Sequence, residues 1–131
     1  MDGNAGDNAY SISFCEQTRL LNLTFSGFWA PETAARFSEE VIDVLKKLSI
    51  ATPVFQTLVD QREFSVQSPE TIRILNEGFA QSRHNNSGPI ALVTPTALGK
   101  FQIERNLSDT KLRVFNDLDL AKEWLADATN P

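Results

Sequence analysis

Apolar and polar side chains alternate with a period of two near the start of the chain. The alternation runs from Tyr10 to Cys15 and returns from Leu21 to Ser26. A period of two is typical of a β-strand with one buried face. Because only a short turn separates the two runs, we expect them to pair as an antiparallel hairpin.

A helical pattern follows the hairpin. Pro31 and Glu32 suit the first turn of a helix, where a missing N–H costs nothing and a negative charge is favourable. The apolar positions that come next predict an amphipathic helix covering a sheet; they are Phe37, Val41, Leu45 and Leu48. The β-rich run over residues 55–60 then predicts a third strand.

A second helix is expected after this third strand. Ser68 is a good N-cap and Pro69 a good first helical residue. The spacing of Ile72, Leu75 and Phe79 predicts the buried stripe of this helix. We expect it to end before the turn-forming residues 85–88.

The next segment repeats the order of strand and helix. Residues 89–93 are nearly all apolar, as expected of a strand that is covered on both faces. Residues 94–96 form another capped start, which predicts a helix with Leu98, Phe101 and Leu107 as apolar positions. Gly99 weakens this helical pattern.

The last elements are a short strand over residues 112–115 and a final helix capped by Asn116 or Asp117. The apolar positions of that helix include Leu118, Ala121 and Leu125. Each connection between strands after the hairpin is long enough for a parallel crossover. The order of elements therefore predicts an α/β fold with a single mixed, mostly parallel five-stranded sheet and about four helices.

The domain organisation follows from the same pattern. We expect one domain over residues 10–126, because 131 residues fit one hydrophobic core. Residues 1–9 are polar and glycine-rich, which predicts a disordered tail, and residues 127–131 are expected to fray. No signal peptide and no membrane span are predicted.

Charge and residue counts exclude several classes of function. The net charge of -5 disfavours nucleic acid as a partner. Cys15 is the only cysteine, so no disulfide within the chain is possible and a cytoplasmic location is the simplest expectation. His84 is the only histidine, and its place at the end of the second helix explains it. We therefore expect no catalytic residues, no metal site and no cofactor.

A binding surface is expected at the carboxyl ends of the parallel strands. Trp29 and Phe64 could form an apolar wall there, with Arg62 beside it for an anionic group. The alternative is that Trp29 closes the core, since buried aromatic side chains dominate the core of a small domain. Arg62 would then pair with Asp60 or Glu63. The candidate residues for a ligand or partner are Phe28, Trp29, Asp60, Arg62, Phe64, Thr94 and Thr96.

Three hydroxyl groups near the second helix are candidate phosphorylation sites. Phosphate on Ser68 would gain from the helix dipole and from free N–H groups. The simpler alternative is that Ser68 only caps the helix. Ser65 and Thr71 are further candidates.

The chain resembles the STAS/SpoIIAA-like family. The resemblance rests on the hairpin start, on Leu58-Val59-Asp60 followed by a loop and a capped helix, and on the closing pattern from Val114 to Leu125. It covers about residues 10–126. The resemblance implies a small bacterial, cytoplasmic regulator that docks on a partner kinase and is switched by phosphorylation of a serine or threonine.

This chain does not preserve the phosphorylation motif of the family. The family usually carries an Asp-Ser pair at the start of the helix after the third strand. When this sequence is aligned with the family pattern on Asp60, Ser68 stands in place of the aspartate and Pro69 in place of the phosphorylated serine. The chain therefore looks like a divergent branch.

Three hypotheses for function remain. The first is a non-catalytic regulatory or protein-interaction module that acts by partner docking or self-association. A homodimer is possible through the exposed edge over residues 10–14. The basic residues Lys100, Arg105, Lys111 and Arg113 could meet an acidic partner or the acidic last helix of a second copy, although a solvated face is the commoner explanation.

The second hypothesis is a carrier or sensor of a small apolar or amphipathic, lipid-like ligand. Its expected apolar lining consists of Phe28, Trp29, Phe64, Phe79 and Phe101. The third hypothesis is an enzyme, for which the sequence offers no pair of nucleophile and base.

Overall fold

The computed structural model describes residues 9–51, 55–86, 88–96 and 111–129. Five strands form one sheet in the order β1-β2-β3-β4-β5, with β1 and β2 antiparallel and all other neighbours parallel. The strands are β1 (Tyr10–Cys15), β2 (Leu20–Gly27), β3 (Gln56–Phe64), β4 (Ile90–Val93) and β5 (Leu112–Phe115). The predicted mixed, mostly parallel sheet with an N-terminal hairpin is confirmed.

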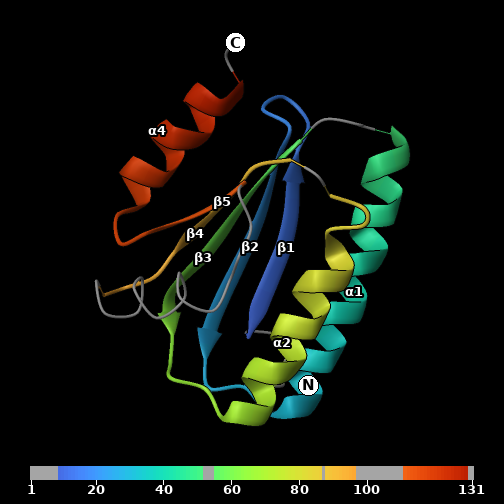
Figure 1. Ribbon diagram of the computed structural model, residues 1–131, viewed down its shortest axis with the longest axis vertical. Helices are drawn as coiled ribbons and strands as arrows, with labels where there is room; N and C mark the ends of the chain where they lie inside the picture. Colours follow the sequence, from blue (N-terminus) through green and yellow to red (C-terminus); the bar gives the residue numbers. More distant parts are fainter. Residues whose placement is uncertain (1–8, 52–54, 87, 97–110, 130–131) are drawn as a thin grey trace.

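Three helices are described: α1 (Pro31–Ala51), α2 (Pro69–Ser82) and α4 (Leu118–Thr129). Figure 1 shows α1 and α2 side by side over one face of the sheet and α4 over the other. The helix expected after residues 94–96, with Leu98, Phe101 and Leu107, falls on residues outside the described part of the chain. The expected tail over residues 1–9 also falls there, apart from Ala9.

The alternation of side chains along the strands divides the core in two. Ile90 and Leu92 of β4 belong to the larger cluster, which β2, β3 and α1 also supply. Ala91 and Val93 belong to the smaller cluster under α4. All four residues of β4 are buried, which confirms that this strand is covered on both faces.

The helices begin at the residues that the caps indicated. Ser68 is the N-cap of α2, with Pro69 as its first residue. The Asp117 carboxylate accepts a hydrogen bond from the backbone N–H of Leu120, 3.1 Å away, and so caps α4. The two N-caps therefore determine the residues at which α2 and α4 begin.

The prediction for the buried stripe of α2 was right only in part, since Leu75 and Phe79 are half-buried against the larger core cluster. The buried residues of this helix are Thr71, Gly78 and Ser82, while Ile72 is exposed. Small residues are buried because α2 packs closely beside α1, and a Cβ atom on Gly78 would lie 2.4 Å from the hydroxyl oxygen of Ser38. The apolar stripe expected to be buried instead lines a pocket.

Strand β3 is longer than the sequence indicated, since it continues from Asp60 to Phe64. The added residues pair only with β2, through Ser26 with Glu63 and Gly27 with Phe64, whereas pairing with β4 ends at Asp60. Among the described strands, this end of β3 therefore pairs on one side only, and its side chains need not be apolar. The polar run hid the strand from the pattern of apolar residues.

Candidate functional site

The loops that follow β2 and β3 lie side by side at one edge of the sheet, at the bottom of Figure 1. The backbone N–H of Ser65 donates to the carbonyl oxygen of Gly27, 3.1 Å away. The side chain of Gln67 adds a second connection: its Oε1 accepts from the N–H of Trp29 at 2.8 Å, and its Nε2 donates to the Gly27 oxygen at 2.9 Å. Sequence reasoning missed Gln67, because an isolated loop glutamine carries no pattern.

Trp29 closes the core at this edge and is only 1% exposed. Its ring centroid lies 4.8 Å from that of Phe25 and 4.9 Å from that of Phe64. The indole N–H donates to the backbone oxygen of Ser26, 3.0 Å away. Trp29 and Phe64 do meet, as the sequence indicated, but as part of the packed core.

Arg62 is paired with Asp60. Two side-chain hydrogen bonds of 3.0 and 2.9 Å join the guanidinium to the carboxylate. The hydrogen bond from Arg62 lowers the pKa of Asp60, and the charge of Lys122 on α4 also lowers it. Asp60 lies on the same face of β3 as Leu58, which belongs to the cluster under α4, and the charges of Lys122 and Asp119 on α4 act on the pair. The register between β2 and β3 shifts after Asp60, which interrupts the alternation, so Phe64 packs with Trp29 on the other face. The candidate residues are thus divided between two faces.

The hydroxyl of Ser68 is engaged at the start of α2. It accepts from the N–H of Thr71 at 3.2 Å and lies 3.1 Å from the Thr71 hydroxyl oxygen. Thr71 is fully buried, and its hydroxyl donates to the backbone oxygen of Trp29. Ser68 therefore has the geometry of an N-cap. Ser65 is exposed in the loop before α2.

Two exposed apolar side chains stand on these neighbouring loops. Phe28 is 66% exposed and Val66 is 93% exposed. We call them the edge pair. Glu32, Glu63 and Glu70 are exposed at the same edge, in the first turns of α1 and α2 and near the end of β3. The edge therefore combines an apolar centre with acidic surroundings.

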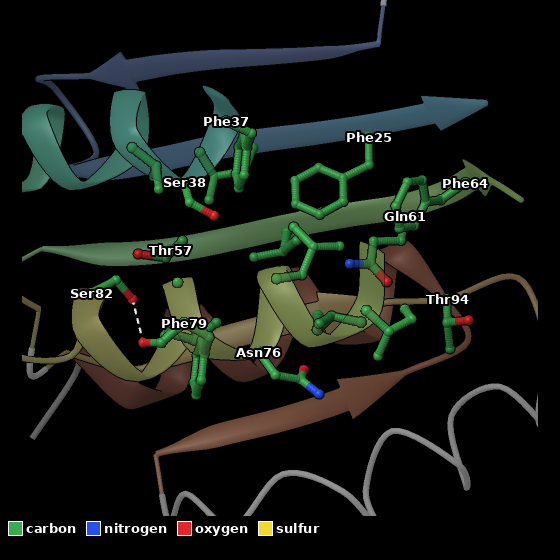
Figure 2. Close-up of a pocket in the computed structure, with 18 of the residues that line it drawn as sticks. Phe25, Phe37, Ser38, Thr57, Gln61, Phe64, Asn76, Phe79, Ser82 and Thr94 are labelled. Carbon is green, nitrogen blue, oxygen red and sulfur yellow. Dashed lines mark hydrogen bonds between the residues drawn. The ribbon is translucent and has the colours of Figure 1, made fainter. Parts of the chain in front are cut away.

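A pocket of about 570 Å³ lies between the sheet and the two helices α1 and α2. Figure 2 shows side chains from the strands and both helices around it. Thr94 is buried at one end of the pocket and Thr96 is exposed there. Most of the wall is apolar: Leu21, Leu23, Phe25, Phe37, Val41, Leu45, Val59, Phe64, Val66, Ile72, Leu75, Phe79, Ile90, Leu92 and Leu112.

The expected lining of the lipid-like site is only partly present around this pocket. Phe64 and Phe79 line it. Trp29 is packed in the core, Phe28 points away from the buried interior as an exposed residue, and Phe101 lies outside the described residues. The apolar stripe of α2 was the signal that could have located the pocket. Small residues such as Gly78 make the contact with α1, so the large apolar side chains of the helix remain to line a pocket.

The described residues contain no group of three His, Cys, Asp or Glu side chains placed to hold a metal ion. His84 is exposed after the end of α2, and Cys15 is half-buried at the end of β1. Hydrogen bonds with Thr18 lower the pKa of the Cys15 thiol. Over the same part of the chain, no helix is long and apolar enough to span a bilayer.

The β1 strand lies at an edge of the sheet and contains no charged residue. Such edges can pair with another strand. On the opposite side, Arg113 lies over the rings of Phe115 and Trp124 at 5.7 and 5.8 Å from their centroids. Lys111 is exposed, while Lys100 and Arg105 fall on residues that the structure does not describe.

The topology and the placement of the helices define a SpoIIAA-like fold. The chain is similar to a DUF3478-family protein of SpoIIAA-like fold from Shewanella loihica, with a TM-score of 0.67 and 16% identity over 89% of this chain and 92% of that one. It is also similar to a candidate anti-sigma factor antagonist from Thermotoga maritima, with a TM-score of 0.59 and 12% identity over 92% and 97% of the two chains. No family model matches the chain. A search of curated proteins finds no match either.

Proposed function

We propose that this chain is a regulatory protein-interaction module that docks a partner protein through the edge pair, Phe28 and Val66. The observation that carries the proposal is the exposure of these two apolar side chains on loops that Gln67 ties together. An apolar side chain on a fixed loop loses little conformational freedom when a partner covers it, which favours binding. The cytoplasm is the proposed location.

The charge at this edge defines the chemistry of the partner. Glu32, Glu63 and Glu70 are exposed on the elements that adjoin the loops of the edge pair. A surface with an apolar centre and a basic rim would be complementary, since opposite charges at the rim raise the rate and specificity of association. We therefore propose a partner protein with an apolar patch flanked by lysine or arginine side chains.

The fold of the Thermotoga maritima neighbour supports a regulatory role, because its description is that of an anti-sigma factor antagonist. The proposed docking does not depend on phosphorylation of Ser68. The hydroxyl of Ser68 is already engaged with Thr71, and Pro69 stands where the resemblance would have a phosphorylated serine. Ser65 stays a candidate modification site, since it is exposed beside Val66.

A quantitative capture experiment tests the proposal. The immobilised wild-type chain, the double variant Phe28→Ala/Val66→Ala and the control Ile50→Ala are each incubated with lysate of the source cells, and bound proteins are quantified by mass spectrometry. Ile50 is a matched control, because it is 86% exposed but lies near the far end of α1. We expect a protein that wild type and Ile50→Ala retain and that the double variant loses by tenfold or more, about 1.4 kcal/mol. Equal retention by all three would refute the proposal.

Self-association is the other form that docking can take. The uncharged edge of β1 favours it, because an open strand presents unpaired backbone groups to a second copy. The predicted homodimer is checked by multi-angle light scattering of the purified chain over a range of concentrations. A monomer mass throughout would rule this form out.

A second candidate function is that of a carrier or sensor of a small apolar or amphipathic ligand. The observation that favours it is the 570 Å³ pocket, which falls within the range of known ligand sites. The two functions are compatible, because Val66 belongs to the edge pair and also lines the pocket. Native mass spectrometry of freshly purified protein tests for a retained ligand.

A further inference from the structure

We propose that the pocket binds an uncharged amphipathic molecule with one hydrocarbon chain and a hydroxyl head group, such as a long-chain alcohol. This inference rests on the carrier function proposed above and specifies its ligand. The apolar wall explains the hydrocarbon chain. The chemistry of the polar residues around the wall explains the head group.

The described lining residues include no Asp, Glu, Lys, Arg or His. The 27 described lining residues therefore offer no opposite charge to an ionised head group. Moving an ionised group into such a site without a partner of opposite charge is costly, whereas a hydroxyl needs only one or two hydrogen bonds. The wall therefore favours a neutral head group over a carboxylate.

The polar groups of the pocket differ in whether they already have partners. The Asn86 amide donates to the Thr57 hydroxyl at 3.1 Å, and the Ser82 hydroxyl donates to the Phe79 oxygen at 2.7 Å. Figure 2 shows the Ser82 bond as a dashed line. These side chains connect β3, α2 and the loop that follows α2. Because they already have partners within the protein, we do not assign the head group to them.

Gln61 and Thr94 are different. Among the described residues, neither side chain has a hydrogen-bond partner; this is also true of Ser38 and Asn76 on the helices, but Thr94, at only 6% exposed, is the most buried of the four. In Figure 2 the amide of Gln61 extends toward the apolar side chains in the middle of the view. A buried polar group without a partner costs stability, so a ligand hydroxyl that bonds to it would gain that free energy back. We assign the head group to Gln61 and Thr94.

The hydrocarbon chain would lie along α2. Ile72, Leu75 and Phe79 line the pocket from this helix, and Val59 and Leu92 line it from the sheet. Ile72 is exposed, so the wall that α2 provides reaches solvent at this residue. A ligand with a single hydrocarbon chain fits this pocket, since α2 contributes one row of apolar residues to its wall.

Isothermal titration calorimetry with two matched probes tests the inference. The intact chain is titrated at pH 8 with 1-decanol and separately with decanoate, which has the same chain length and an ionised head group. We expect saturable binding of 1-decanol at least tenfold tighter than that of decanoate. Gln61→Leu should weaken 1-decanol binding about fivefold, while Gln81→Leu, on an exposed part of α2, should leave it unchanged.

The outcomes separate the inference from the function on which it rests. Decanoate binding as tight as 1-decanol would overturn the neutral head group and leave the carrier function standing. Absence of saturable binding for both probes would overturn the inference and the carrier function together. Circular dichroism and urea unfolding of Gln61→Leu exclude misfolding. Leu75→Trp, which places a larger side chain in the pocket and leaves Gln61 and Thr94 unchanged, should abolish binding in a folded protein.

Discussion

The side-chain oxygen of Gln67 accepts a hydrogen bond from the backbone N–H of Trp29, 2.8 Å away. The two residues are far apart in sequence, and the bond joins the loops that carry Val66 and Phe28. The amide nitrogen of Gln67 donates to the carbonyl oxygens of Gly27 and Ser65. One side chain thus replaces the backbone pairing that ends with β3.

Replacing Gln67 tests this connection. We expect Gln67→Ala to lower the free energy of unfolding by about 1 to 3 kcal/mol, because the N–H of Trp29 loses its acceptor in a part-buried place. Urea unfolding at neutral pH measures the change. Gln81→Ala, on the exposed side of α2, is the matched control and should cost far less. Equal effects of both substitutions would contradict the proposed role of Gln67.

The N-cap of α2 gives a second prediction. Ser68→Ala should lower the free energy of unfolding by about 1 kcal/mol, because the N–H of Thr71 loses its acceptor. Ser68→Asp should keep most of the stability, since aspartate caps a helix as well as serine does. Partner capture should be unchanged in both variants. A loss of capture in Ser68→Asp with intact stability would instead point to a phosphorylation switch.

The close approach of α1 and α2 gives a third prediction. An alanine at an interior helical position usually stabilises by about 1 kcal/mol relative to glycine. At Gly78 it should instead destabilise by about 1 to 3 kcal/mol, because its Cβ would lie 2.4 Å from the Ser38 hydroxyl oxygen and 2.9 Å from the Ser38 Cβ. The double variant Gly78→Ala/Ser38→Gly removes both contacts. Thermal unfolding should show recovery in the double variant, and its failure to recover would argue against this packing.

The pair of Asp60 and Arg62 gives a prediction for pH. The hydrogen bond from Arg62 holds the pKa of Asp60 below its ordinary value of 3.8. A carboxyl group whose pKa is lower in the folded state stabilises the fold above its unfolded pKa, and this contribution is lost as the pH falls through the folded pKa. Arg62→Gln should raise the pKa of Asp60, which NMR titration of its carboxyl carbon measures. The stability of this variant should fall less between about pH 5 and about pH 2 than that of wild type. An unchanged pKa would show that Arg62 is not the cause.

The architecture was predictable because local and global signals agreed. The hairpin at Tyr10 to Ser26, the caps at Ser68 and Asp117 and the apolar run before Thr94 each reflect a local physical requirement. The strand order follows from them, since a helix between two strands requires a parallel crossover. The far end of β3 was missed because an open edge permits polar residues such as Arg62 and Glu63.

The candidate site was less predictable, because it depends on contacts between distant segments. The sequence indicated which residues lie near the carboxyl ends of the strands. It could not indicate that a register shift between β2 and β3 would leave Asp60 and Arg62 toward α4 while Phe64 packs against Trp29. The role of Gln67 and the pocket beside α2 both arise from tertiary packing. A close pair such as Gly78 and Ser38 decides which face of the helix is buried.

Photo-crosslinking tests the proposed docking surface most directly. Phe28 is replaced by p-benzoylphenylalanine, a photoreactive residue of similar shape, and Ile50 is replaced in the same way in a control chain. We predict that irradiation in the source cells crosslinks a partner protein to the chain labelled at position 28 and not to the chain labelled at position 50. Additional loss of that crosslink with Val66→Ala would connect both members of the edge pair to one interface. A partner that crosslinks equally at positions 28 and 50, or only at position 50, would contradict the account.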